Sequence, residues 1–370
     1  MLVLVTGGAG FNGSHLVDRF LKEGFRVRIL DNLTPRVHPF GPPSFLPSEV
    51  EFVRGSVTDP DTMERALENV DIVFHQAAYQ DYMPDFSTFI SVNAMGTALI
   101  YEIIVRKKLP VEQIIMASSQ AVYGEGQYDC LTHGKFVPSA RSRERLDAGQ
   151  WEVMCAQCRQ EAPPRMLEEE VVNPCNPYAV SKFAAERVAL GLGTLYGIPT
   201  TALRYSITQG PRQSLYNQYS GIARIFGMSL LRGEPVTIYE DGRQTRDFVH
   251  VNDVVEANMF VLGRAEANFQ AFNVGSGVAT SVLDYAGKLA EKLKKKPEIR
   301  ITGQYRVGDN RHSVSSIAKL KALGWSPRYD LDGILGDFSE WLMENFQMIA
   351  PLPSAYGEMM SQGVVRESMR

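Results

Sequence analysis

The chain has 370 residues, of which 44% are hydrophobic and 22% are charged, and its formal net charge at pH 7 is -4. A chain of this length and hydrophobicity can bury a sizeable core, which excludes wholesale disorder. The slightly acidic balance offers no basic face for nucleic acid, and no apolar run approaches the roughly 20 residues that a membrane-spanning helix needs. We therefore expect a globular protein with no nucleic-acid and no membrane partner.

The first half of the chain alternates short apolar runs with helical patterns. In chain order the predicted elements are a strand at Leu2–Val5, a helix at 12–23, strands at 26–30 and 50–53, a helix after Asp59, a strand at 71–74, a helix at 89–106 and a strand at 113–117. Strands that alternate with helices join through right-handed crossovers into a parallel sheet covered on both faces. The sequence therefore predicts an α/β fold with a doubly wound parallel sheet.

The second half is less regular and suggests a smaller C-terminal α/β lobe. After a polar interruption from Gly124 to Pro174, the pattern predicts a helix from Tyr178, a strand at 200–204, and helices at 281–294 and 315–323. The expected division is a first lobe at 1–205 with an insertion at about 125–173, an interleaved substrate lobe at 206–345, and a C-terminal tail at 346–370.

A glycine-rich segment follows the first predicted strand and opens the first helix. It reads Gly7-Gly8-Ala9-Gly10-Phe11-Asn12-Gly13, and Asp31 closes the next strand. Glycine permits the tight turn and the close approach of a pyrophosphate, whose charge the helix N-terminus stabilises. The carboxylate of Asp31 can accept hydrogen bonds from a ribose diol and would repel a 2′-phosphate. The pattern predicts a dinucleotide site that prefers NAD to NADP.

Tyr178 and Lys182 are spaced so that both project from one face of a helix. Asn176 is a favourable N-cap and Pro177 a favourable first residue, so this helix should begin at the tyrosine. A nearby ammonium group and an oxidised nicotinamide would both stabilise the phenolate and lower the pKa of Tyr178 toward the working range of a base. Ser119, at a predicted strand end, could hydrogen-bond a substrate alcohol or carbonyl beside the tyrosine.

These motifs together resemble the extended short-chain dehydrogenase/reductase superfamily and, within it, the NAD-dependent nucleotide-sugar epimerase and dehydratase family. The resemblance extends to about Trp341 and includes Thr6–Phe11, His75–Ala78, Asn93, Ser119, Tyr178, Lys182, Leu203–Tyr205, Gly210–Arg212 and Arg246–Val249. It implies a Rossmann lobe that holds NAD tightly and a C-terminal lobe that binds a nucleoside-diphosphate sugar. Two segments, Val172–Tyr178 and Arg204–Gly210, look most like the dTDP-L-rhamnose 4-epimerase group.

The resemblance also implies roles for single residues. Tyr178 would be the general base, Lys182 would tune it and anchor the ribose, and Ser119 would be its hydroxyl partner. The residues implied at the cofactor are Gly7, Gly10, Phe11, Asn12, Asp31, Asn32, Ser56, Val57, Gln76, Ala77, Ala78, Gln80, Asn93, Ser118, Tyr178, Lys182 and Tyr205. Those implied at the substrate are Ser119, Gln120, Arg212, Arg246 and Arg306. Arginine suits a diphosphate because its guanidinium group can pair with two oxygens.

Two positions narrow the reaction. Sugar 4,6-dehydratases of this superfamily carry an acidic pair directly after the catalytic hydroxyl residue, whereas this chain has Gln120 and Ala121. Neither side chain can act as an acid or a base, so dehydration is disfavoured. We expect epimerisation at C4 of the sugar through a transient 4-keto intermediate. The alternatives are a nucleotide-sugar reductase or dehydrogenase, and a non-catalytic NAD-binding regulator.

The resemblance further implies a homodimer, because the family commonly dimerises through the helices near Asn93 and Tyr178. Four cysteines in a chain of this length do not form a disulfide framework, and we expect a cytoplasmic protein.

Three of the four cysteines lie in the predicted insertion. It contains Cys130-x-x-His133 and Cys155-x-x-Cys158, the paired spacings of a structural zinc knuckle. A short insertion with few apolar residues can become ordered around a metal ion. A redox pair at Cys155 and Cys158, or four unrelated residues, are the other interpretations.

Overall fold

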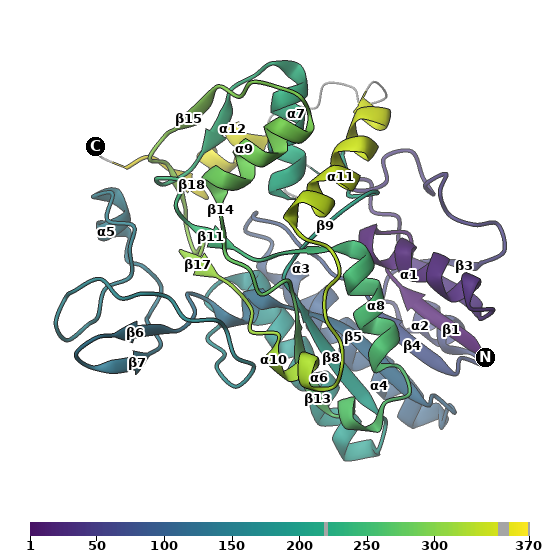
Figure 1. The fold of residues 1–370 in the computed structure, drawn as a ribbon. Helices are drawn as coiled ribbons and strands as arrows, with labels where there is room; N and C mark the ends of the chain where they lie inside the picture. The colour runs from purple at the N-terminus through teal and green to yellow at the C-terminus, as the bar shows by residue number, and fades with distance from the viewer. Residues whose placement is uncertain (218–220, 347–354, 369–370) are drawn as a thin grey trace.

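A computed structural model describes residues 1–217, 221–346 and 355–368 of the chain. Its centre is a seven-stranded parallel sheet with the strand order β13-β8-β5-β4-β1-β2-β3 (Figure 1). The strands are β1 (Leu2–Thr6), β2 (Arg26–Asp31), β3 (Glu51–Arg54), β4 (Ile72–His75), β5 (Gln113–Ser119), β8 (Thr200–Tyr205) and β13 (Gln270–Val274). The order reverses between β1 and β4, which confirms the predicted doubly wound α/β fold.

Helices cover both faces of this sheet. One layer consists of α1 (Phe11–Lys22), α8 (Val251–Val261) and α10 (Ala318–Ala322), and the other of α2 (Pro60–Leu67), α4 (Gly96–Lys107) and α6 (Pro177–Tyr196). Because side chains alternate along a strand, Val3 and Val5 enter the first core while Leu2 and Leu4 enter the second. The strands and helices predicted in the first half are all present, with bounds shifted by at most a few residues.

One helix is longer and more apolar than was predicted from the sequence. α3 (Phe86–Phe89), a π-helical turn (Ile90–Met95) and α4 run on as a single helix, Phe86–Lys107, which is long and apolar enough to cross a bilayer by length and composition. In this structure 44% of its apolar window is buried. Its second half packs on α2 and α6, which is the arrangement of a core helix in a globular domain.

The second lobe has its own apolar core. It is built from α7 (Ile222–Arg232), α9 (Val282–Lys292), α11 (Leu331–Asn345), β10 (Val236–Ile238) and β15 (Ile299–Ile301). The sequence pattern predicted α9 and α10 but missed α7, α8, α11 and β13. Gln270–Val274 returns the chain to the central sheet, and this edge position depends on pairing with β8 rather than on a local signal.

Short strands pair with one another in the second half of the chain. They are β9 (Ile207–Gln209) with β12 (Phe248–His250), β11 (Thr245–Arg246) with β14 (Thr280–Ser281) and β17 (His312–Ser313), and β16 (Tyr305–Arg306) with β18 (Val365–Arg366), which follows α12 (Ala355–Ser361). Single-turn helices lie at Gln120–Tyr123 and Ala265–Ala267.

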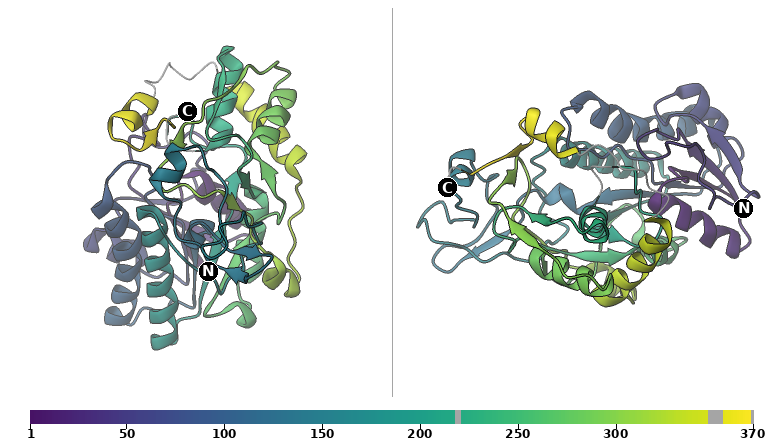
Figure 2. Two further views of the ribbon diagram at one scale, coloured as in Figure 1. Left: turned by 90° about the vertical axis from the view of Figure 1, so that its left-hand side faces the viewer. Right: turned by 90° about the horizontal axis from the view of Figure 1, so that it is seen from above.

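The predicted insertion forms β6 (Tyr128–Cys130), β7 (Gly134–Phe136) and α5 (Arg143–Asp147). Figures 1 and 2 show these elements at the opposite end of the molecule from β1, β2 and β3, on the side where the described C-terminal residues lie.

Candidate active site

The glycine-rich turn lies at the carboxyl end of β1, where the strand order reverses. Gly7 has a φ of 70°, and a Cβ atom on it would lie 2.8 Å from the backbone of Ala77, which follows β4. A Cβ atom on Gly13 would lie 2.1 Å from the carbonyl oxygen of Gly7. Glycine at these two positions lets the turn pass close to β4 and brings α1 onto the sheet.

The N-terminus of α1 has the features of a phosphate site. Gly10 is the N-cap; among the described residues no side chain caps the helix, and its first turn carries no acidic residue. Its N–H groups are therefore available to a ligand. At the end of β2 the carboxylate of Asp31 accepts hydrogen bonds from the N–H groups of Ala9 (3.0 Å) and Leu33 (2.9 Å). An uncapped helix terminus beside a fixed carboxylate fits the phosphates and ribose of NAD.

The other residues predicted at the cofactor reach the same edge of the sheet. Phe11 and Asn12 occupy the first turn of α1, where the side-chain oxygen of Asn12 is buried with no hydrogen-bond partner among the described residues. Residues that follow the carboxyl ends of β2, β3 and β4 are Asn32, Ser56, Val57, Gln76, Ala77, Ala78 and Gln80. The parallel sheet thus gathers distant parts of the sequence, and their contact with a cofactor stays a prediction.

Tyr178 lies in the first turn of α6 and faces Ser119 at the end of β5. The side chain of Asn176 caps the helix by accepting a hydrogen bond from the N–H of Ala179 (2.8 Å), and Pro177 is the first helical residue, as predicted. The hydroxyl group of Ser119 favours the phenolate of Tyr178, but burial dominates and raises the pKa of Tyr178 to about 12. The protein alone therefore does not produce the expected lowering of this pKa, because a buried phenolate is poorly solvated.

Lys182 lies one helical turn further along α6 and is only 4% exposed. Its Nζ donates a hydrogen bond to the carbonyl oxygen of Ala117 in β5. Burial lowers the pKa of Lys182 to about 8, against the opposing effect of the Glu186 carboxylate. The side chain is thus still an ammonium group at neutral pH, on the same helix as the phenol.

Asn93 connects the loop after β4 to α6. Its side-chain oxygen accepts a hydrogen bond from the N–H of Tyr79 (2.8 Å), and its nitrogen donates to the carbonyl oxygen of Tyr79 (3.0 Å) and to Ser181 (2.8 Å). This amide is fully buried. It positions the two segments that flank the site.

Ser118 and Tyr205, also predicted at the cofactor, use their hydroxyl groups within the protein. Ser118 donates to the carboxylate of Glu186 (2.6 Å), which forms a buried ion pair with Arg204. Tyr205 donates to the side-chain oxygen of Gln76 (3.2 Å). Both hydroxyls therefore tie neighbouring elements together at the sheet edge.

The three candidate arginines do not form one cluster. Arg246 lies 3.1 Å from one carboxylate oxygen of Asp309, and Arg306 lies 3.9 Å from the other. Arg212 instead pairs with Asp18 on α1 (2.7 Å). The terminal nitrogens of Arg246 also donate to three main-chain carbonyl groups, so they are already occupied within the protein.

Arg306 has the better geometry for an anion. Its guanidinium carbon lies 3.9 Å from the ring centroid of Tyr82 and 5.6 Å from that of Tyr239. Its Nε is buried with no hydrogen-bond partner among the described residues. The sequence analysis assigned no role to Tyr82 or Tyr239. Tyr82 could have been considered because it follows β4 at the ligand-binding edge, whereas nothing local marked Tyr239.

Gln120 turns toward the second lobe, where its side-chain oxygen accepts a hydrogen bond from Ser313 (3.1 Å).

No role was predicted from the sequence for Asp247, which is next to Arg246. Its buried carboxylate accepts hydrogen bonds from Ser206 (2.9 Å), which follows β8, and from the N–H of Ser276 (2.8 Å), which follows β13.

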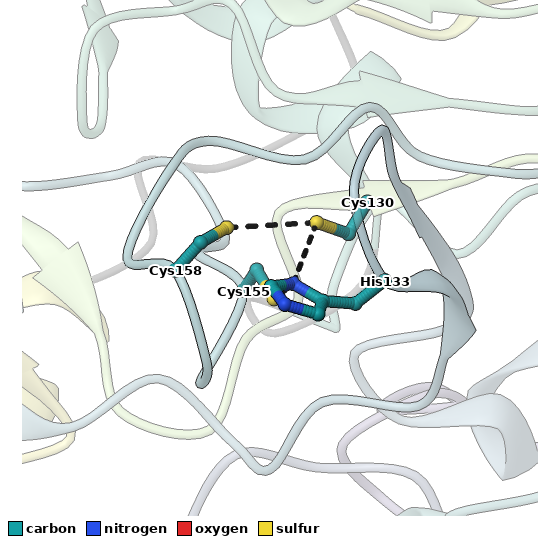
Figure 3. A group of neighbouring side chains, drawn as sticks. All are labelled: Cys130, His133, Cys155 and Cys158. Atoms are coloured by element: carbon teal, nitrogen blue, oxygen red, sulfur yellow. Dashed lines mark hydrogen bonds between the residues drawn. The ribbon is translucent and has the colours of Figure 1, made fainter.

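The four cysteine and histidine residues of the insertion come together away from Tyr178. The ligand atoms of Cys130, His133, Cys155 and Cys158 all lie within 4.8 Å of one another (Figure 3). The sequence placed them in two separate pairs, and the fold brings the pairs into one cluster.

The sheet, the glycine-rich turn and the Tyr178–Lys182 pair define an extended short-chain dehydrogenase/reductase. The chain belongs to the NAD dependent epimerase/dehydratase family, whose model matches residues 3–141 and 156–275. Residues 142–155, which separate the two matched segments, lie in the insertion.

Several relatives align with nearly the whole chain. A dTDP-L-rhamnose 4-epimerase of Burkholderia thailandensis is 33% identical over 349 residues, which cover 92% of this chain and 95% of the relative. A putative UDP-glucose 4-epimerase of Methanocaldococcus jannaschii is 31% identical and covers 93% and 99%. Among solved structures, the UDP-glucose 4-epimerase of Thermotoga maritima with UDP-glucose superposes with a TM-score of 0.75 at 30% identity, covering 94% and 100%. That of Thermus thermophilus in complex with NAD gives 0.71 at 30% identity, covering 93% and 99%.

Proposed function

We propose that this protein is an NAD-dependent epimerase that inverts C4 of a nucleoside-diphosphate sugar. The observation that carries the proposal is the meeting of Tyr178, Ser119 and Lys182 at the sheet edge that also holds the glycine-rich turn. Gln120 and Ala121 offer no acid or base next to this group, which favours epimerisation over loss of water. Relatives with 4-epimerase names over more than nine-tenths of the chain support the same reaction.

In the proposed reaction Tyr178 takes the proton of the C4 hydroxyl group while Ser119 hydrogen-bonds the same oxygen. NAD held between the glycine-rich turn and Asp31 would supply the hydride chemistry, taking up hydride from C4 and returning it to the opposite face once the sugar has turned in the site. Tyr178 then returns the proton to the C4 oxygen, so no second base is needed. The Lys182 ammonium, charged below its pKa of about 8, stabilises the phenolate.

Replacing the phenol tests this mechanism. Tyr178→Phe removes the only proton carrier proposed at C4, and turnover should fall by about 10³-fold with NAD still bound. The measurement is conversion of a panel of UDP- and dTDP-sugars, with the configuration at C4 read by NMR. Tyr196→Phe, at the exposed far end of the same helix, is the matched control and should keep wild-type turnover.

Two results would contradict the proposal. Retained turnover in Tyr178→Phe would exclude the phenol as the base. Stoichiometric release of NADH with a nucleotide sugar would show a dehydrogenase instead, because an epimerase regenerates its bound cofactor within each cycle and works without added NAD.

We further propose a dTDP-hexose as the substrate, a homodimer and a cytoplasmic location. The relative from Burkholderia supports the nucleotide. Apolar side chains on the helix 86–107 and on α6 are at least partly exposed and would be covered by a second copy; they are Phe86, Ile90, Met95 and Val180. Light scattering of the purified protein measures the mass of the assembly.

Four free cysteines fit a reducing compartment, which supports the cytoplasmic location.

We also propose that the insertion holds a structural zinc ion, separate from the reacting centre. Three cysteines and one histidine are the donor set of a closed zinc site, which leaves no open position for substrate. The hydride mechanism needs no Lewis acid, so this ion would act on the fold rather than on the sugar.

A further inference from the structure

We infer that the insertion is a zinc-organised module that positions the segment 305–313, which carries the substrate candidate Arg306 and the partner of Arg246, Asp309. The proposal of a metal site is based on the geometry of its four candidate ligands. The positioning role rests in addition on the proposed function, because it concerns the binding of a nucleoside diphosphate.

Two short hairpins present the ligands. β6 and β7 pair antiparallel, and the turn between them carries Cys130 and His133 at its ends. A second hairpin runs over residues 153–162, where the N–H of Cys155 donates to the carbonyl oxygen of Gln160 (2.9 Å). The turn of this hairpin carries the other two ligands. Two facing turns with two ligands each form the arrangement of a zinc knuckle.

Three of the six separations between ligand atoms match a tetrahedral zinc site, and all six are within 4.8 Å. The Sγ of Cys130 lies 3.4 Å from the Nδ1 of His133 and 3.6 Å from the Sγ of Cys158, and the Sγ of Cys155 lies 3.5 Å from the same nitrogen. With Zn–S near 2.3 Å and Zn–N near 2.0 Å, the edges of a tetrahedron measure about 3.5 to 3.8 Å. Figure 3 shows the four side chains converging on one point from the two turns.

The two hairpins have only a small apolar core between them. This core consists of Tyr128, Val153 and Ala162, with Phe136 packed against it. A core this small does not offset the entropy of ordering such a segment, and small modules commonly depend on a metal or on disulfides. All four cysteines of the chain are free thiols here, which leaves the metal as the cross-link. Binding of Zn²⁺ would displace one proton from each coordinating thiol, with no change of oxidation state.

The second hairpin is joined directly to the substrate lobe. Glu152, three residues before Cys155, accepts a hydrogen bond from the Nε of Arg311 (3.0 Å) and lies 3.3 Å from the Nε2 of His312. Arg311 is completely buried, whereas the side chain of Glu152 is 32% exposed. Trp151 packs on Tyr305 at the start of the same segment.

A second buried contact reaches the main chain of Asp309, whose carboxylate lies near both Arg246 and Arg306. Arg141 of the insertion donates hydrogen bonds to Glu240 (2.9 Å) and to the carbonyl oxygen of Asp309 (3.0 Å). The side chain of Asp309 holds Arg246 at 3.1 Å and lies beside Arg306. The insertion thus fixes the backbone of Asp309, near Arg306 in the same segment, so loss of the metal should weaken the binding of a diphosphate at Arg306.

Metal content tests the site independently of catalysis. Full-length protein should contain one zinc ion per chain, as measured by inductively coupled plasma mass spectrometry. After substitution with cobalt, its absorption spectrum should show the d–d bands of a tetrahedral thiolate site. Cys155→Ser and Cys158→Ser should lose most of the metal, whereas Cys175→Ser, which alters the cysteine outside the cluster, should keep it. Metal-free wild-type protein, or full zinc retention in both cluster variants, would overturn the site.

Nucleotide binding tests the positioning role. Titration with UDP and dTDP should give about fivefold weaker binding in Cys155→Ser and in Glu152→Gln than in wild type, with bound NAD unchanged. Glu152→Gln should keep its zinc, so this variant tests the contact with Arg311 while the metal site is intact. In the wild-type protein, removal of zinc with a chelator should weaken nucleotide binding, and adding zinc back should restore it. Equal affinities in all proteins would overturn the positioning role. Failure of wild type to bind either nucleotide would overturn the proposed function, while the metal content would still decide the zinc site.

Discussion

His75 is enclosed beneath the candidate active site, at the carboxyl end of β4. Its Nδ1 lies 2.7 Å from the hydroxyl oxygen of Thr6, and its Nε2 lies 3.0 Å from that of Thr97. Burial, reinforced by the charge of Lys182, lowers the pKa of His75 to about 3. The imidazole therefore stays neutral next to the buried ammonium group and links β1, β4 and α4 by hydrogen bonds.

This shift predicts a pH dependence of stability. Below its ordinary pKa of 6.5 the unfolded chain protonates His75, whereas the folded protein does not until about pH 3, so the free energy of unfolding should decrease as the pH falls through this window. At pH 5 the loss from this residue is about 2 kcal/mol. Urea unfolding at pH 7 and pH 5 measures it, and His75→Gln should lose less stability between the two pH values than wild type. Equal losses in the two proteins would contradict the assignment.

At the scale of secondary structure, α6 carries the phenol and the ammonium group, and it also contains two glycines in different surroundings. A Cβ atom on Gly191 would meet nothing within 4 Å, whereas one on Gly193 would lie 2.4 Å from the hydroxyl oxygen of Thr200 in β8. Gly193 thus allows the helix to approach the sheet closely. Gly191 carries only the entropic disadvantage of glycine in a helix.

The two positions should respond oppositely to alanine. Gly191→Ala should stabilise the protein by about 0.5–1 kcal/mol, because alanine favours the helix and the added methyl group is free of contacts. Gly193→Ala should destabilise it by about 1–3 kcal/mol, because α6 must move away from β8. Denaturant unfolding of each variant measures both effects. Equal changes would show that the distance between helix and sheet does not depend on this glycine.

At the scale of the whole molecule, the C-terminal segment returns to the substrate side. β18 pairs antiparallel with β16, which places Val365 opposite Arg306. Val365 and Met359 pack on Met83 from the loop after β4. Part of the predicted tail is therefore integrated into the second lobe, and residues 347–354 of it lie outside the described residues.

Removing this segment should weaken substrate binding more than cofactor binding. A chain shortened after Phe346 loses the strand that pairs with β16, so the KM for the nucleotide sugar should rise about fivefold while NAD stays bound. Steady-state kinetics and the NAD content of the purified protein measure the two effects. An unchanged KM would show that Arg306 is held without this strand.

Features encoded in contiguous residues were predictable. The alternation of strands and helices, the glycine-rich turn and the capped start of α6 each occupy a short stretch, and each follows from local periodicity or from the conformational preference of single residues. The family resemblance rests on the same stretches. For this reason the doubly wound sheet and the position of Tyr178 on its helix could be predicted before any packing was known.

Only the tertiary structure decided how distant segments meet. Burial, which no local pattern measures, raises the pKa of Tyr178 in the protein alone, whereas the predicted lowering also requires an oxidised nicotinamide. The carbonyl groups that occupy Arg246 and the rings beside Arg306 come from separate parts of the chain. The composition likewise shows four cysteines, but only the folded structure shows that three of them lie around one histidine. These outcomes depend on contacts between residues far apart in the sequence, and such contacts exist only when both lobes and the insertion are packed together.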